Sequence, residues 1–527
     1  MHVAIVGAGV GGLAAAVRLA SAGLDVTLLE ASQGPGGKLR EAEIAGRTID
    51  VGPTVFTMRD VFDDIFASAG ERLDDHLTLD RSETIARHLF ADGSKLDLFA
   101  DQRKSEAAIT AFSGSRSAQE YAAFCHRAQA VCETLSPIFM RASRPSGPLG
   151  LVARAGPLGL SSILKIGAET TLWKALSGQF SDPRLAQLFA RYATYNGSSP
   201  FLAPATLMLI AHVEKCGVWF VEGGMKRLAE ALASLAERQG ATLRYGAAVQ
   251  AIETDNGKVS GLRLVNGEAI AADVVLTNCD VGALSGGLFG PEAQAAVDHP
   301  LKRDERSLSA VTVAVEAPVG GLELLRHNVF FSADYGSEFD DILARRKLPA
   351  DPTVYVCASD RDDRGALSQE ATRRGRERLF MIINAPADGD ITDFDNREVE
   401  RCVTTALSRL QASGLQVGRP DWAQMVLSTP SDFETRFPAT GGALYGRASH
   451  GSTASFRRPG ARTRLPGLYL CGGSAHPGAG LPMAALSGKL AAEAILADRA
   501  STRASRRGAT PGGMWTRFLP TGNTLSR

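Results

Sequence analysis

The sequence has no cysteine spacing typical of disulfides, no excess charge of one sign and no apolar run of membrane-spanning length. Its seven cysteines are scattered between Cys125 and Cys471 without a Cys-x-x-Cys pair, which is typical of reduced thiols in a cytoplasmic protein, and we predict no metal site. Fifty-seven basic residues balance 57 acidic ones, so no overall field attracts nucleic acid. Charges interrupt every window of about 20 residues, which argues against a membrane-spanning helix and leaves a peripheral membrane contact open.

The chain is long enough for several cores. Its 527 residues correspond to roughly three domain-sized units, and the 55 glycines indicate many tight turns. The first residues form a βαβ pattern, because the apolar run 2–6 predicts a buried strand, the alanine-rich segment 13–22 a helix, and 25–30 a second parallel strand. The apolar N-terminus is not read as a signal peptide, since its glycines fit a motif of their own.

That motif lies between the first strand and the helix. Gly7-x-Gly9-x-x-Gly12, which includes Gly11, permits a tight turn, the close approach of a pyrophosphate and close helix–strand packing. The helix directs free N–H groups and about half a positive charge toward such phosphates. Glu30, 23 residues after Gly7, is placed to hold ribose hydroxyls. The motif predicts a dinucleotide site without separating NAD from FAD.

Two further glycine segments favour FAD. Gly36-Gly37-Lys38 resembles the second glycine motif of the FAD-dependent amine oxidase and desaturase superfamily. Asp50-x-Gly52-Pro53-Thr54 resembles a loop that runs beside the flavin there, although Gly52-Pro53 alone would suit an ordinary turn. The resemblance implies FAD as cofactor, with contacts from Gly37, Lys38, Gly52, Pro53 and Thr54.

Residues 471–483 form a third such segment, Cys-Gly-Gly-Ser-Ala-His-Pro-Gly-Ala-Gly-Leu-Pro-Met. It resembles the C-terminal signature of the bacterial carotenoid desaturases, in which a helix N-terminus faces the flavin. The resemblance implies flavin contacts from Gly472, Gly473, Pro482 and Met483, and Val249 is added as a further cofactor contact. We interpret His476 as a packing residue rather than a base, and Cys471 as a buried thiol rather than a covalent flavin link. No catalytic residue is assigned.

The similarity to bacterial carotenoid desaturases covers residues 1 to about 498, including 219–225 and 327–339. It implies an α/β fold with a Rossmann-like FAD-binding domain of the glutathione-reductase type, an inserted mixed-sheet substrate domain and a helical, membrane-facing subdomain. The expected parts are an FAD-binding domain (1–60, 220–300 and 460–498), a helical region (61–219), a sheet domain (301–459) and a flexible basic tail (499–527). Within the tail, Trp515, Phe518 and Leu519 are candidates for membrane contact.

The stretch 52–59 resembles one branch of that family. Met58-Arg59 stands where phytoene desaturases tend to carry Asp-Pro, and it is similar to the 1-hydroxycarotenoid 3,4-desaturases, or methoxyneurosporene dehydrogenases. We therefore expect Met58 and Arg59 to line the substrate tunnel, with Arg59 near a hydroxyl or methoxy group. The alternative is that Arg59 is a solvated residue at the start of a helix.

The resemblance implies a reaction in carotenoid biosynthesis: desaturation at C3–C4 of a 1-hydroxy- or 1-methoxycarotenoid, by hydride transfer to FAD. No triad or carboxylate pair stands out, which suits an enzyme that mainly positions its substrate and excludes water. The amphipathic segment 149–176 is either an interfacial entrance or an ordinary core helix. We expect a cytoplasmic protein peripherally associated with the inner membrane; the electron acceptor is unknown.

Three other functions stay open. A phytoene desaturase or related carotenoid oxidase would share every flavin motif. An amine oxidase would act on a soluble substrate and release peroxide. A non-enzymatic protein of this scaffold, such as a GDP-dissociation inhibitor, would not need the intact phosphate loop, ribose acid and C-terminal flavin segment found here.

Overall fold

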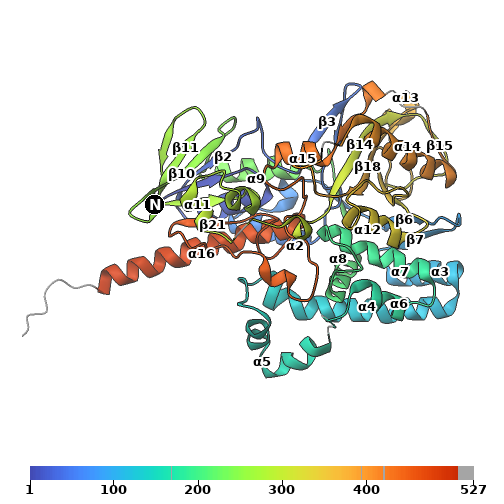
Figure 1. The fold of residues 1–527 in the computed structure, drawn as a ribbon, viewed down its shortest axis with the longest axis horizontal. Coiled ribbons are helices and arrows are strands. Elements are labelled where there is room, and N and C mark those ends of the chain that lie inside the picture. Colours follow the sequence, from blue (N-terminus) through green and yellow to red (C-terminus); the bar gives the residue numbers. More distant parts are fainter. Residues whose placement is uncertain (166, 168, 299, 393, 419–421, 509–527) are drawn as a thin grey trace, which may run out of the picture.

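The computed structural model describes residues 1–508, apart from 166, 168, 299, 393 and 419–421. Two sheet-containing units lie side by side, and a group of helices lies below them in the view of Figure 1. The helix α16 (Leu481–Gly508) runs along the first unit and projects beyond it.

The first unit is built on a parallel sheet with the strand order β21-β13-β1-β2-β9. Its strands are β1 (His2–Val6), β2 (Asp25–Leu29), β9 (Thr242–Arg244), β13 (Val274–Thr277) and β21 (Leu468–Leu470). They confirm the βαβ unit predicted at the N-terminus and the return of the chain to this sheet. Because all five strands are parallel, their carboxyl ends meet at one edge, where ligands bind in folds of this kind.

Both faces of this sheet are covered. On one face α1 (Val10–Ser21) packs against α16 and α9 (Lys226–Arg238). On the other lies an antiparallel sheet of β10 (Val249–Asp255), β11 (Lys258–Leu264) and β12 (Ala269–Ala271). Positive φ at Asn256 and Gly257 forms the hairpin turn between the first two of these strands, as an Asn-Gly pair favours. Burial on both sides explains why β1 is an unbroken apolar run.

The second unit is a seven-stranded sheet with the order β20-β14-β18-β17-β16-β6-β7. Its strands are β6 (Thr84–Leu89), β7 (Lys95–Phe99), β14 (Ser309–Ala317), β16 (His327–Phe330), β17 (Val354–Ala358), β18 (Glu377–Ala385) and β20 (Val426–Ser428). The helix α14 (Asn396–Ala412) packs its Val399, Val403 and Leu410 against one face.

Two of these strands correct the prediction that 61–219 is a largely helical region. Both β6 and β7 belong to that range, and β6 pairs in parallel with β16, so that Val329 lies opposite His88. The partner strand is about 240 residues away in the sequence. A six-residue strand that carries Arg87 and His88 has a weak local pattern, and its distant partner decides its conformation.

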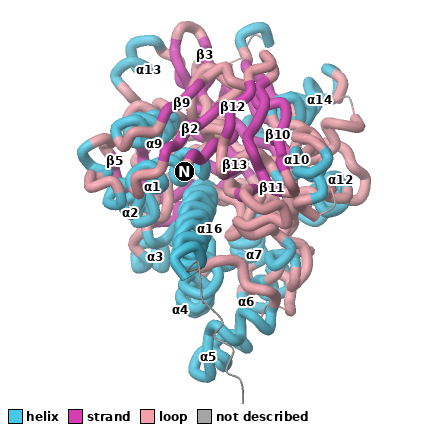
Figure 2. Tube along the Cα trace, turned by 90° about the vertical axis from the view of Figure 1, so that its left-hand side faces the viewer, coloured by secondary structure: helices cyan, strands magenta, loops and turns pink. Residues whose placement is uncertain are grey.

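Most of the remaining part of that range is helical, as predicted. It contains α3 (Gln102–Ser113), α4 (Ser115–Leu135), α5 (Pro148–Lys165), α6 (Leu172–Gln179), α7 (Pro183–Ala190) and α8 (Leu209–Cys216). Positive φ at Gly156 interrupts α5, which protrudes at the lower end of the molecule in both views (Figures 1 and 2). In the described part of the chain, no helix combines the length and the apolar character needed to cross a bilayer.

Shorter elements connect these units. They are β3 (Glu41–Ile44), β4 (Arg47–Asp50), α2 (Arg59–Ser68), β5 (Leu79–Arg81), β8 (Trp219–Val221), α10 (Val281–Ser285), α11 (Pro291–Ala295), β15 (Val319–Gly321), α12 (Tyr335–Leu343), α13 (Gln369–Arg374), β19 (Leu415–Val417) and α15 (Pro430–Arg436). The helix α16 reaches Gly508, so the first ten residues of the predicted tail, 499–508, are helical, and their alanines and arginines favour a helix. The candidates Trp515, Phe518 and Leu519 lie outside the described residues.

A buried ion cluster ties the β3–β4 hairpin to the second sheet. Arg47 donates hydrogen bonds to Asp360 at 2.6 Å and to Glu316 at 3.1 Å, and the side chains of both acids are at most 1% exposed. Arg378 also donates to Asp360, and Arg374 to Glu316. Buried carboxylates need such partners to stay charged.

We therefore expect Arg47→Met to lower the free energy of unfolding by about 3 kcal/mol, because both acids lose a buried partner. The measurement is denaturant-induced unfolding. Arg227→Met is the control, since this side chain is 61% exposed and its pair with Glu230 should contribute less than about 1 kcal/mol. Equal unfolding midpoints for the two variants would contradict the role given to the cluster.

Candidate active site

The turn between β1 and α1 leaves no space for side chains. Gly7 has φ +98°, and a Cβ on Gly12 would lie 2.2 Å from the Gly7 carbonyl oxygen. A Cβ on Gly11 would lie 2.6 Å from Oδ1 of Asn278. Gly9 is the N-cap of α1 and carries no side-chain cap. The predicted glycines therefore hold an uncovered helix N-terminus at the carboxyl edge of the sheet.

Glu30 lies beside this turn, as predicted. Its carboxylate accepts hydrogen bonds from the backbone N–H of Ala8 at 2.7 Å and from the backbone N–H of Ser32 at 2.9 Å. Its carbonyl oxygen accepts from the N–H of Ala247 at 2.8 Å, which brings the start of β10, with Val249, to the same side of the sheet. The geometry suits an acid that holds the ribose of a dinucleotide.

The second glycine segment runs alongside the first. Gly36 forms a parallel bridge with Gly9, and a Cβ on Gly37 would lie 3.3 Å from the Gly9 Cα. Gly52 approaches even more closely, since its Cβ would lie 2.0 Å from the carbonyl oxygen of Lys38. The three N-terminal segments singled out in the sequence thus form one continuous backbone surface.

Asn278, which no sequence motif singled out, joins this surface to the C-terminal segment. Its Nδ2 donates to the Gly7 carbonyl at 3.4 Å, and its Oδ1 accepts from Cys471 Sγ at 3.6 Å. A Cβ on Gly472 would lie 2.9 Å from the same Oδ1. The available signal was its position, a polar residue directly after a buried parallel strand.

A cavity of about 370 Å³ opens from these segments into the space between the two sheets and the helices. Of the predicted residues, it is lined by Lys38, Gly52, Pro53, Thr54, Met58, Pro482 and Met483. Apolar residues from the other units form much of its wall: Leu135, Phe139, Met140, Leu207, Leu209, Ile210, Val213, Phe380, Ile382, Phe433, Phe437 and Leu444. Beside it, a Cβ on Gly473 or Gly480 would meet no atom within 4 Å, so a flat ring can approach the backbone there.

Two cations, the half-buried Lys38 and the buried Arg458, lie at the end of the cavity near the C-terminal segment. Lys38 donates to the Leu444 carbonyl, and its ammonium lies 5.0 Å from the centre of the Phe437 ring. Arg458 donates to the Gly473 carbonyl at 2.8 Å, and burial lowers its pKa to about 10, so it stays charged at neutral pH. Together with the N-terminus of α16, these charges favour an anionic group at this end.

His476 and Cys471 have the surroundings of packing residues. The His476 Nε2 donates to the Ala142 carbonyl at 2.9 Å, and its ring lies edge-on to Phe139. Burial lowers the pKa of His476 to about 4, so the imidazole is neutral at pH 7. Cys471 is fully buried, and burial raises the pKa of its thiol. Neither geometry gives a reason to assign catalysis.

Met58 and Arg59 separate in the structure. Met58, at φ 50°, lines the cavity. Arg59 begins α2 and pairs instead with Asp74 at 2.5 Å and Asp63 at 3.4 Å. This placement matches the alternative interpretation of Arg59 as a solvated residue at a helix start, because its donors are directed to surface aspartates and not to the cavity.

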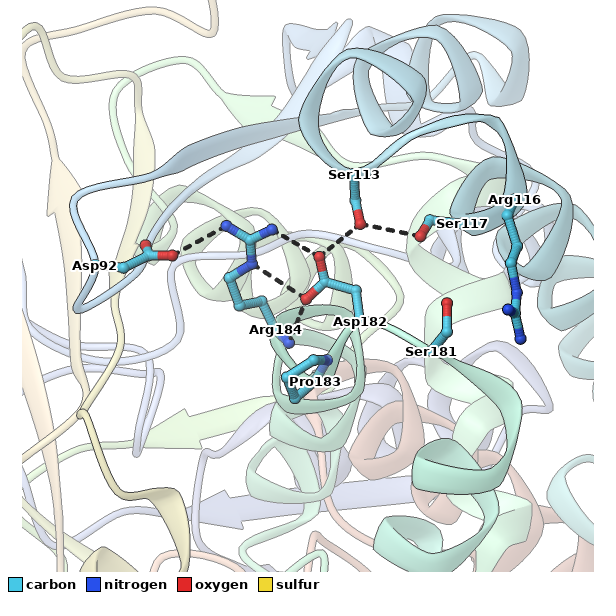
Figure 3. A pocket seen from close by; sticks show the side chains of 8 residues that line it. All are labelled: Asp92, Ser113, Arg116, Ser117, Ser181, Asp182, Pro183 and Arg184. Carbon is cyan, nitrogen blue, oxygen red and sulfur yellow. Dashed lines mark hydrogen bonds and ion pairs between the residues drawn. The ribbon is translucent and has the colours of Figure 1, made fainter.

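A second hollow, of about 570 Å³, lies on the helical group (Figure 3). Arg184 donates to Asp182 at 2.7 Å and to Asp92 at 3.0 Å, and Ser113 donates to Asp182 at 2.6 Å. These polar groups satisfy one another, and no glycine segment borders them. The hollow therefore has none of the features of a cofactor site.

Comparison with known proteins agrees with this geometry. The family described as flavin containing amine oxidoreductase matches residues 10–496. The hydroxyneurosporene desaturase of Rubrivivax gelatinosus is 49% identical over 527 residues, with 99% of this chain and 98% of that protein covered. The hydroxyneurosporene desaturase of Cereibacter sphaeroides is 44% identical over 504 residues, with 95% and 98% covered.

The fold is shared with solved structures as well. An oxidoreductase from Methanosarcina mazei superposes with a TM-score of 0.56 at 15% identity, over 94% of this chain and 100% of that one. The predicted α/β class with an FAD-binding domain is thereby confirmed, and the chain belongs to the flavin-containing amine oxidoreductase family as an FAD-dependent oxidoreductase.

Proposed function

We propose that the protein is a carotenoid desaturase that introduces a C3–C4 double bond into 1-hydroxy- or 1-methoxycarotenoids, derivatives of neurosporene or lycopene. The observation that carries the proposal is the single cavity that joins the flavin-type segments 52–54 and 477–483 to a largely apolar wall. Such a wall suits a long hydrocarbon better than a soluble amine. The names of the two hydroxyneurosporene desaturases support the substrate class.

FAD would be held by the residues predicted from the sequence. Gly7, Gly9, Gly11 and Gly12 leave the N-terminus of α1 uncovered, where the pyrophosphate would bind, and Glu30 would hold the ribose. The flavin would border the remaining predicted contacts, Gly37, Lys38, Gly52, Pro53, Thr54, Gly472, Gly473, Pro482 and Met483, with Val249 on the ribose side. When bound, FAD supplies the hydride acceptor. The chain itself positions the substrate and excludes water from the apolar cavity.

The substrate would enter from a membrane surface. The predicted entrance, 149–176, includes α5, where Leu149 is 86% exposed while Leu151 is buried. Side chains of 157–166 lie outside the described residues. We propose peripheral attachment to the cytoplasmic face of the inner membrane, and the exposed apolar residue on a protruding helix supports a membrane contact.

The FAD assignment predicts a binding defect for Glu30→Ala. Loss of the hydrogen bonds that a charged carboxylate makes to ribose should raise the Kd for FAD at least about tenfold. Flavin titration of the apoprotein measures this. Glu43→Ala, at an exposed position in β3, is the control and should bind like the wild type. An unchanged Kd for Glu30→Ala would remove this residue from the site.

The substrate assignment predicts which carotenoid changes. With FAD and liposomes that contain 1-hydroxyneurosporene, chromatography should show a product with an absorption spectrum red-shifted by one conjugated double bond, while phytoene stays unchanged. Conversion of phytoene would instead identify the protein as a phytoene desaturase. Peroxide released from amines without lipid would instead favour an amine oxidase.

The membrane assignment predicts weaker vesicle binding for Leu149→Glu, by roughly tenfold, because an apolar side chain no longer enters the interface. Vesicle flotation measures the bound fraction. Leu288→Glu, which replaces a leucine that is 45% exposed on the first unit, is the control. Equal flotation of the two variants would place the membrane contact elsewhere.

A further inference from the structure

Arg191 brings a charge to the wall of the largely apolar cavity. It lies directly after α7, and its guanidinium packs 5.3 Å from the ring centres of both Tyr195 and Tyr355. Among the described residues it has no carboxylate within 4.0 Å, and its one side-chain hydrogen bond is to the Tyr195 hydroxyl at 3.4 Å. A guanidinium has five N–H donors, so most of them are unused by the protein.

The surroundings keep this group charged. Burial opposes the charge, but Tyr195 and Glu214 outweigh it and raise the pKa of Arg191. Glu214 is itself buried on the cavity wall and accepts a hydrogen bond from Tyr192 at 2.6 Å. Burying a charged group without hydrogen-bonding partners is unfavourable. Arg191 is half-buried and faces the cavity, so its free donors are available to an oxygen atom of a ligand.

The position of Arg191 relates it to the reacting carbons. Tyr355, on which the guanidinium packs, shares a 2.6 Å hydrogen bond with Thr54, in the loop proposed to border the flavin. In a 1-hydroxy- or 1-methoxycarotenoid, a single carbon separates the oxygen-bearing C1 from C3. When C3–C4 faces the flavin, the C1 oxygen must lie close to the same loop.

We propose that Arg191, oriented by Tyr195 and Tyr355, donates a hydrogen bond to the C1 oxygen of the substrate and thereby selects oxygenated carotenoids. A guanidinium only donates, and hydroxyl and ether oxygens both accept, so one residue serves both substrates. This inference rests on the proposed function. It assigns to Arg191 the substrate contact that the sequence had suggested for Arg59.

The test compares 1-hydroxyneurosporene with 1,2-dihydroneurosporene, which has the same saturated C1–C2 bond but no oxygen. For Arg191→Met we expect the preference for the hydroxylated substrate, as a ratio of kcat/KM values, to fall about 10- to 100-fold, the effect of one lost charged hydrogen bond. Arg191→Lys should retain part of the preference. Arg116→Met, at an 81% exposed position, is the control. FAD content and the equilibrium Kd of both carotenoids are measured for each variant.

Three results would overturn the inference. An Arg191→Met variant that keeps the wild-type preference excludes the contact. Equal losses on both substrates, or loss of FAD, would show that Arg191 supports the cavity or the cofactor. If the wild-type protein shows no preference for the hydroxylated carotenoid, the proposed substrate is wrong. This failure of the proposed function is seen in the wild type, so it can be distinguished from a failure of the Arg191 inference. Should Arg191→Met not fold, Tyr195→Phe, which removes the hydroxyl that orients the guanidinium, must reduce the preference in the same direction.

Discussion

Three segments that are remote in the sequence meet at the carboxyl edge of the first sheet, and their backbones are too close for side chains. The turn at Gly7–Gly12, the segment at Gly36 and Gly37, and Gly472 all contact one another or Asn278. A side chain at several of these positions would overlap backbone atoms, which cannot move aside without opening the sheet. The remaining parts of the site depend on this packing, because it fixes where α1 and α16 direct their N-termini.

The parts of the structure that follow local rules could be predicted from the sequence. The first βαβ unit and its glycine turn have a pattern within one short window. Glu30 could also be predicted, because its separation from the glycines along the chain is set by the length of the βαβ unit. The family resemblance added the cofactor, which glycines and an acid could not distinguish.

The parts that depend on distant partners could not be predicted. The strand β6 acquires its conformation from β16, and Asn278 acquires its role from Cys471, 193 residues away. In the sequence, Arg191 is an ordinary arginine at the end of a helix, and only the fold shows that its guanidinium packs on Tyr355. Arg59 shows the opposite case. Its position in the sequence suggested a substrate contact, but in the structure it pairs with Asp74. Charged residues are difficult to interpret from sequence because their partners decide their function.

The pairing of β13 with β21 has a consequence for how the protein is made. The first sheet contains residues from both ends of the chain, so a nascent polypeptide presents β13 as an open edge until Leu468–Leu470 leave the ribosome. An unpaired apolar edge is a template for association with other chains. The roughly 190 residues between β13 and β21 must therefore be synthesised before these two strands can pair, and we expect chaperones or early cofactor capture to protect the chain during that interval.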